Sequence, residues 1–183
     1  MADYEFSSAY VDSIVRGLKR SPRFAELEAK LSPAAANLIA NSWSGAWQPA
    51  LAFEELGEVA VATLGASTFE ELTHTSMKDR FGPIVLPLIK GSMAASNKSP
   101  AAVLKKLNEL VKVAMRGITV QFEAEASGTS GVLKVAYPRP VAVHVGSSWM
   151  GVLRFVFEVT SPGQATDCTL QPNVGVLLFR VTW

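Results

Sequence analysis

Histidine and cysteine, the side chains that most often ligate metals or act as nucleophiles, are rare in this sequence. The chain has two histidines, His74 and His144, and one cysteine, Cys168. No two of them stand at a spacing such as His-x-x-x-His or Cys-x-x-Cys, which brings two ligands onto one metal ion. One histidine can still be the axial ligand of a haem, and His74, on a predicted helix close to Met77, is the better candidate. The sequence therefore predicts no metal and no cofactor, with haem as an alternative.

Motifs of nucleophilic catalysis and of phosphate binding are also missing. Cys168 lies in a predicted strand without the basic neighbour that stabilises a thiolate. The run Gly146–Gly151 lacks the Gly-x-Ser-x-Gly spacing of a nucleophile elbow, and the sequence has no Gly-rich phosphate loop. We therefore predict a non-enzymatic protein. An enzyme with an unrecognised site stays open, and it would gather His74 or His144 with carboxylates in a polar cleft.

Large apolar side chains are the strongest remaining indication of function. Trp43 and Trp47 stand in the turn-rich segment 41–49, where tryptophan is well placed to meet a partner. Most other aromatic residues are typical of core packing, although some can line a pocket. The predicted residues for binding a ligand or a partner are Trp43, Trp47, His74, Met77 and Trp149.

Composition and charge restrict the possible partners. Over 183 residues, 17 basic side chains balance 16 acidic ones, for a net charge of +1. This balance argues against nucleic acid and against a polybasic membrane anchor. No secretory signal and no long apolar run is visible, so we expect a cytoplasmic protein without a membrane span. The single cysteine fits a reducing compartment.

The segment from Ser99 to Ala126 shows a change of periodicity. Ser99-Pro100 predicts a helix start, and apolar residues then recur on one face of a helix as far as Ala114. Gly117 ends that pattern. Ile118 to Phe122 then alternate apolar and polar residues, as a half-buried strand does. The first part of the chain is therefore predicted to be mainly helical and the second part rich in strands.

Further elements complete the predicted fold. Ser21-Pro22 and Ser32-Pro33 resemble Ser99-Pro100 as helix starts. In the second half, 132–137 predicts a strand, and Val141 to Val145 prolong it or form an edge. Trp149 to Val159 favours a strand by propensity, but its polar positions follow a helical period, which predicts a buried helix. Segments 166–171 and 176–183 predict a closing hairpin.

The predicted fold is an α+β domain with N-terminal helices packed on a four-stranded antiparallel sheet and one helix between its second and third strands. We expect a single domain over 1–183. Within it, residues 1–40 form a helical extension, 41–116 a helical layer, and 117–183 the sheet.

Several short motifs resemble a family of uncharacterised proteins found mainly in myxobacteria. In chain order, the matching segments are Trp47-Gln48-Pro49 with Phe53 and Leu56, Gly65, Arg80-Phe81-Gly82-Pro83, Asn97-Lys98-Ser99, Gly151-Val152-Leu153 and Phe179-Arg180-Val181-Thr182-Trp183. The family is distantly similar to the fold of haem nitric-oxide sensors, vinyl-reductase-type ligand-binding domains and vesicle-transport subunits. That resemblance implies helices over a four-stranded sheet, with an apolar cavity between them. The sequence departs from the family at Val141 to Val145, and neither histidine stands in a clear haem-ligand context.

Together these features predict a regulatory or signalling domain that binds an apolar small molecule or a protein partner, with a homodimer as one form of the latter. Nucleic acid and membranes are not expected as partners. The alternatives are an enzyme with an unrecognised site and a haem-based gas sensor.

Overall fold

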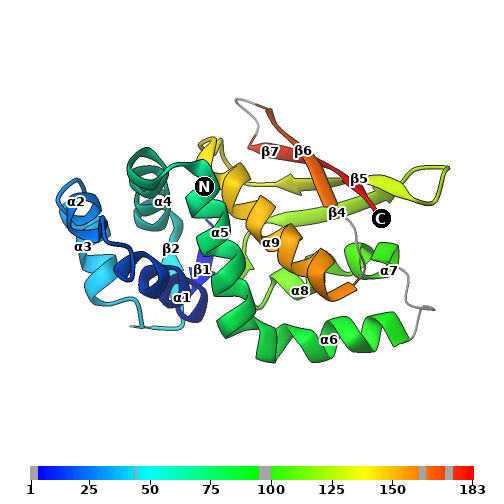
Figure 1. Ribbon diagram of the computed structural model, residues 1–183, viewed down its shortest axis with the longest axis horizontal. Helices are drawn as coiled ribbons and strands as arrows, with labels where there is room; N and C mark the ends of the chain where they lie inside the picture. The colour runs from blue at the N-terminus through cyan, green and yellow to red at the C-terminus, as the bar shows by residue number, and fades with distance from the viewer. Residues whose placement is uncertain (1–3, 44, 95–99, 161–163, 172–174) are drawn as a thin grey trace.

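The structure, a computed structural model, describes residues 4–43, 45–94, 100–160, 164–171 and 175–183 (Figure 1). The N-terminal part contains β1 (Glu5–Ser7), α1 (Ser8–Lys19), α2 (Phe24–Glu28), α3 (Pro33–Ala40), β2 (Trp47–Pro49), α4 (Ala50–Leu64) and α5 (Ala66–Ser76). The π-helix η1 (Met77–Phe81), α6 (Gly82–Ala94), α7 (Pro100–Lys105), α8 (Leu107–Val111) and β3 (Met115–Arg116) follow. The remaining elements are β4 (Thr119–Ala124), β5 (Ser130–Ala136), α9 (His144–Thr160), β6 (Gln164–Gln171) and β7 (Val176–Thr182).

A four-stranded antiparallel sheet in the order β4-β5-β7-β6 forms the C-terminal part, with α9 connecting β5 to β6. Alternate residues of β5 and β7 are buried against the helices, as expected for strands with one face in the core. These inward residues are Leu133, Val135, Leu177, Phe179 and Val181. The α+β class, the alternating strand after Gly117 and the closing hairpin are thus confirmed. Cys168 lies in β6, and its side chain is outside the described residues.

A second sheet, which the sequence prediction missed, corrects the predicted architecture. Strand β1 lies between β2 and β3, with both neighbours antiparallel to it. The inward face of this small sheet carries Phe6 from β1, Gln48 from β2 and Met115 from β3, and all three side chains are buried. Strands of two or three residues are too short to show a period of two in a sequence. The fold therefore has a small three-stranded sheet in addition to the four-stranded one.

The predicted central helix is also corrected, because it is broken into α7 and α8 at Lys106. Both short helices lie beside β4, and the Asn108 side chain accepts a hydrogen bond from the Val120 amide at 2.9 Å. This bond satisfies one amide on the open edge of β4. Gly117 has φ = 82°, so the change from helix to strand turns at a residue in the left-handed region that favours glycine. Residues 95–99, including the predicted cap Ser99, lie outside the described part of the chain.

The helix predicted over Trp149 to Val159 is confirmed as part of α9, whereas the strand predicted from Val141 to Val145 is wrong. Val143 is 77% exposed in a turn, and Val145 already belongs to the first turn of α9. Of the predicted Ser-Pro starts, Ser32 is confirmed as a cap, since its hydroxyl accepts from the Ala35 amide at 3.3 Å. The start at Ser21-Pro22 is too early, because α2 begins at Phe24.

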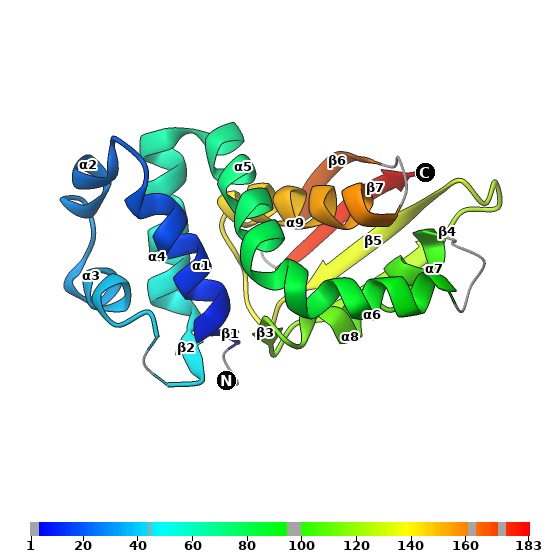
Figure 2. The ribbon, with the colours of Figure 1, turned by 60° about the horizontal axis from the view of Figure 1, so that its bottom comes forward.

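Helix α5 lies in the middle of the molecule, between the N-terminal helices on one side and α9 with the sheet on the other (Figures 1 and 2). It approaches α9 at Gly151, where an added Cβ would lie 2.5 Å from the Glu70 carbonyl oxygen and 2.9 Å from the His74 amide nitrogen. It approaches α1 at Gly17, where an added Cβ would lie 3.0 Å from Leu72 Cγ. Glycines therefore allow the close approach on both sides of α5.

Replacing Gly151 tests whether this close approach holds the two parts of the fold together. We expect Gly151→Ala to lower the free energy of unfolding by about 1–3 kcal/mol, because the new methyl group overlaps backbone atoms that cannot move aside easily. Gly91→Ala in α6 is the matched control, since nothing lies within 4 Å of an added Cβ there. This control should be neutral or stabilise the protein by up to about 1 kcal/mol, as alanine does in a helix. Urea unfolding measures both, and equal effects of the two variants would contradict the interpretation.

Candidate functional site

The five residues predicted to bind a ligand or partner lie in three separate places. Trp43 is 52% exposed, and Trp47 is half-buried at the start of β2. His74 is buried in α5, facing α9. Met77 and Trp149 belong to the hydrophobic core. The structure therefore does not gather them into one pocket.

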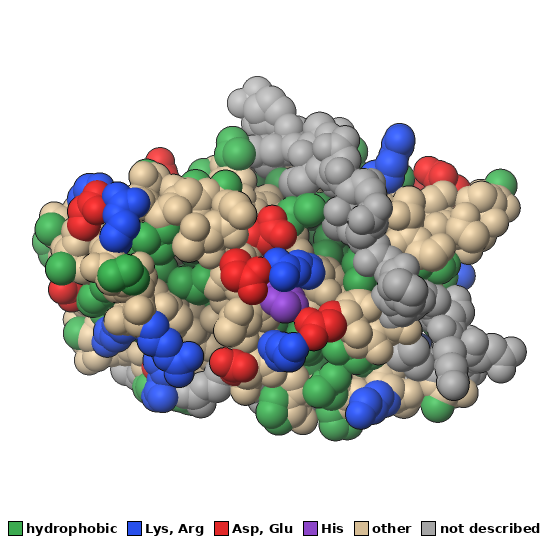
Figure 3. Space-filling view, in the orientation of Figure 1, with side chains coloured by type: hydrophobic (Ala, Val, Ile, Leu, Met, Phe, Trp, Pro, Cys, Tyr) green, Lys and Arg blue, Asp and Glu red, His purple; other side chains and the backbone are tan. Residues whose placement is uncertain are grey.

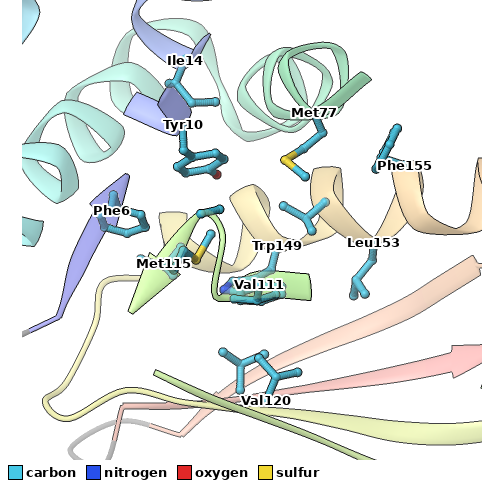
Figure 4. Close-up of a cluster of buried hydrophobic side chains, with 14 of the residues drawn as sticks. Phe6, Tyr10, Ile14, Met77, Val111, Met115, Val120, Trp149, Leu153 and Phe155 are labelled. Atoms are coloured by element: carbon cyan, nitrogen blue, oxygen red, sulfur yellow. The ribbon is translucent and has the colours of Figure 1, made fainter. Parts of the chain in front are cut away.

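The core between the N-terminal helices and α9 is filled by aromatic and apolar side chains (Figure 4). Trp149 is 1% exposed, and its indole Nε1 donates a hydrogen bond to the Tyr137 hydroxyl at 2.6 Å. Tyr10 from α1 shares a hydrogen bond of 3.2 Å with Ser148, and burial raises the pKa of the Tyr10 hydroxyl to about 12. These buried polar contacts tie α1 and the end of β5 to α9.

Two small cavities of about 30 Å³ each lie among the described residues of this core. One lies near Phe53, Gly57, His144 and Trp149, and the other lies near Met77 and Phe155. A volume of that size is close to the share of liquid volume that one water molecule takes. Neither of these two cavities has the size of the apolar cavity that the family resemblance implies.

His144 is the first residue of α9, and its ring rests on α4. An added Cβ on Gly57 would lie 2.9 Å from His144 Nε2, so glycine is required for this contact. Burial lowers the pKa of His144, and the nearby carboxylate of Glu58 partly opposes that shift. The ring is thus held as a mainly neutral packing group against α4.

His74 lies within a cluster of charged side chains that joins α5 and η1 to α9. Its Nε2 atom is 2.7 Å from Glu158, whose carboxylate also accepts from Lys78 Nζ at 2.6 Å. Its Nδ1 atom is buried and lies 3.8 Å from Glu71, which pairs with Arg154 at 2.5 Å. Figure 3 shows these acidic and basic side chains around a histidine over α5 and α9. The hydrogen bonds from Lys78 and then from His74 lower the pKa of Glu158.

This geometry is typical of a charged cluster that holds two helices together, and less so of a catalytic dyad. We call the side chains of His74, Lys78, Glu71, Arg154 and Glu158 the α5–α9 clamp. His74 Nε2 is bonded to the Glu158 carboxylate, and Nδ1 is buried without a hydrogen-bond partner, 3.8 Å from Glu71; the side chain is only 10% exposed. A general base needs a ring nitrogen within reach of the proton it removes from a substrate. Among the described residues, no group of three or more histidine, cysteine, aspartate or glutamate side chains is placed to hold a metal ion.

A hollow larger than these two lies on the surface, between the C-terminal half of α1 and the outer side of α5. It encloses about 880 Å³, within the range of small-molecule sites. Its floor is the contact of Gly17 with Leu72. Six hydroxyl-bearing residues and four charged ones contribute to its walls, namely Ser13, Ser21, Ser67, Thr68, Thr75, Ser76, Arg16, Arg20, Glu71 and Asp79.

The sequence prediction missed this groove. In the sequence alone, Lys19 and Arg20 indicate only the basic end of a helix, which favours the helix dipole. Asp12 gave the signal that could have found it, because it is an acidic residue on the apolar face of α1. In the structure Asp12 is 3% exposed and pairs with Arg16 at 2.7 Å.

Comparison with known proteins shows a distant likeness in fold. No family model matches the chain, and no curated protein matches it significantly. The likeness to the myxobacterial family therefore stays a prediction. A solved structure from a study of "Modulating Heme Redox Potential Through Protein-Induced Porphyrin Distortion" matches with a TM-score of 0.53 and 7% identity. The match covers 97% of this chain and 99% of the other, so the two share an overall fold. None of the described helices is long and apolar enough to cross a membrane.

The charged cluster around Glu158, the α5–α9 clamp, predicts that the free energy of unfolding depends on pH. Because the pKa of Glu158 is lower in the folded protein than its ordinary value of 4.5, its contribution is present above pH 4.5. That contribution is lost as the pH falls through the folded value. We expect Glu158→Gln to reduce the loss of stability between about pH 6 and pH 3. Urea unfolding across this range measures it.

Glu123→Gln, at an exposed position of β4, is the matched control for the change of carboxylate to amide. It should leave the pH dependence close to that of the unmodified protein. If the two variants alter the profile equally, the charged cluster does not stabilise the α5–α9 contact.

Proposed function

We propose that this chain is a non-enzymatic regulatory or signalling domain that binds a protein partner through its outer surface. The observation that carries the proposal is the position of the tryptophans predicted from the sequence. Trp43 is exposed, and Trp47 lies on the outward face of the small sheet. We call the residues Trp43, Trp47, Glu5 and Arg116 the tryptophan surface.

The tryptophan surface combines side chains that are common in protein interfaces. The Arg116 guanidinium lies over the Trp47 ring, 4.6 Å from its centre, and forms an ion pair with Glu5. Stacking of this kind holds both side chains in place before a partner arrives. Tryptophan and arginine are enriched among the residues that dominate binding energy at interfaces. The stacked pair of Trp47 and Arg116, with the exposed Trp43 four residues before Trp47 in the chain, therefore supports recognition of a protein.

The sequence also predicts an apolar small molecule as the ligand, and the structure supports this alternative less than it supports a protein partner. The structural neighbour comes from a study of haem, and haem is much larger than either cavity of about 30 Å³. Typical ligand pockets enclose about 300–1,000 Å³. His74 directs its nitrogens at Glu158 and Glu71, and His144 is packed on Gly57. Neither histidine is therefore placed to ligate a haem.

The enzyme alternative predicts a polar cleft that gathers a histidine with carboxylates. His74 has two carboxylates as neighbours, but its Nε2 atom is bonded to Glu158 and its Nδ1 atom is buried, so neither ring nitrogen reaches open space. His144 lines a cavity with room for about one water molecule. No observation on the described residues favours catalysis over binding.

Photo-crosslinking tests the proposed function. A benzophenone amino acid placed at position 43 should give a discrete protein adduct in the cells that produce the protein. Trp47→Ala should weaken that adduct by roughly tenfold or more, because truncating a central tryptophan commonly costs about 2 kcal/mol or more of binding energy. Mass spectrometry identifies the adduct, a second copy of this chain included.

The same probe at position 143 is the control, since Val143 is 77% exposed and outside the tryptophan surface. Absence of an adduct at position 43, or the same adducts at both positions, would contradict the proposal. A Soret band in the purified protein, or an apolar ligand seen by native mass spectrometry, would favour the alternative forms of the prediction.

A further inference from the structure

We propose that the groove between α1 and α5 binds a small organic phosphate through Arg16 and Arg20. This site is separate from the tryptophan surface and does not depend on the function proposed above. The inference starts from the groove itself, which at about 880 Å³ is large enough for a small molecule.

Arg16 is oriented by buried groups. Its Nε atom donates to the Asp12 carboxylate at 2.7 Å, and the Asp12 side chain is 4% exposed. Ser42 donates to the other Asp12 oxygen at 2.9 Å, which fixes the carboxylate. The Arg16 side chain is 54% exposed and lines the groove. A guanidinium held through Nε has its other donors left for a ligand, and the held geometry reduces the entropy lost on binding.

Arg20 follows Arg16 by four residues, so the two guanidinium groups lie on the same side of α1. Both line the groove. Like charges one turn apart repel each other weakly, and an anion between them relieves that repulsion. A phosphate group offers at least three acceptor oxygens, so two guanidinium groups can share it. A carboxylate has two oxygens, which a single guanidinium already satisfies in a bidentate pair. The pair of arginines therefore favours phosphate.

The opposite wall supplies neutral hydrogen-bonding groups. Ser67, Thr68 and Thr75 of α5 are exposed and line the groove. Their hydroxyls can donate to phosphate oxygens or bind a polar body attached to the phosphate. Leu64 and Leu72 give the groove an apolar part that accommodates the carbon skeleton of an organic ligand.

The acidic residues of the groove leave the arginine end open to an anion. Glu71 pairs with Arg154 on α9, so its charge is balanced away from α1. Asp79 lies in η1, beyond the end of α5 where Ser76 donates to the Ser13 carbonyl. Because α1 and α5 run antiparallel here, with Ser13 near Ser76 and Gly17 near Leu72, Arg20 and Asp79 stand at opposite ends of the groove. We therefore expect the phosphate at the Arg20 end.

Calorimetric titration of the full chain with pyrophosphate and with ADP tests the site. Both should bind at a stoichiometry of one, and Arg20→Gln should weaken the binding by at least about tenfold, the effect of losing a charge-assisted contact. Arg20 is exposed, so this variant is expected to keep the fold, which its melting temperature checks. Lys19→Gln is the matched control, because Lys19 is an exposed cation of the same helix outside the groove lining.

The Asp12→Asn variant distinguishes the role of Asp12 in orienting Arg16 from the effect of net charge on binding. It raises the net positive charge of the region, so simple attraction would strengthen binding, whereas loss of the Arg16 orientation weakens it. The proposal predicts weaker binding for Asp12→Asn and binding within about twofold of the unmodified protein for Lys19→Gln. No binding of either ligand, or equal losses for Lys19→Gln and Arg20→Gln, would overturn the proposal. Neither result bears on the tryptophan surface, which photo-crosslinking tests by itself.

Discussion

The fold depends on the contact between α5 and α9, where Gly151 allows two helix backbones to meet without side chains between them. This contact joins the N-terminal helices to the sheet, because the other side of α5 lies against α1 through Gly17 and Leu72. Close backbone approach leaves little space for a ligand between the layers, and the two remaining cavities have room for about one water molecule each. The charged cluster around His74 spans the edge of the same contact. One steric constraint therefore explains both the filled interior and the clamp on the surface.

The parts of the fold that the sequence predicted are those with a sustained period. The helical spacing around Arg154 and Glu158 identified α9 against the strand propensity of its valines, and the alternation after Gly117 identified β4. The small sheet could not be predicted, because its strands are too short and its pairing joins residue 5 with residue 116. The break at Lys106 is likewise invisible in the apolar pattern, which continues in phase across it. Both short helices contact β4, and such tertiary contacts are not encoded in the local sequence.

For the candidate site, the types of the residues indicated which side chains are exposed, but their places in the sequence did not indicate which of them meet in the fold. Tryptophan in a turn-rich segment indicated exposure, and Trp43 is indeed on the surface. His74, Met77 and Trp149 were grouped by their chemistry, yet the fold directs them into a clamp and a packed core. Asp12 and Arg16 became meaningful only once α1 was placed beside α5 and Ser42 was brought to α1 from the segment after α3. The chain shares its overall fold with a structure studied for its haem, and in this chain the described core between α5 and α9 is packed with aromatic and apolar side chains.

Xenon binding measures most directly whether the interior is closed. Xenon enters apolar cavities of about 150 Å³ in proteins without large structural change. In a crystal pressurised with xenon, the account predicts no xenon site among Phe53, Trp149, Met77 and Phe155, which line the two small cavities. A well-occupied xenon site there would show a cavity able to take an apolar ligand. That result would contradict the claim that the close α5–α9 contact leaves no space for a ligand between the layers.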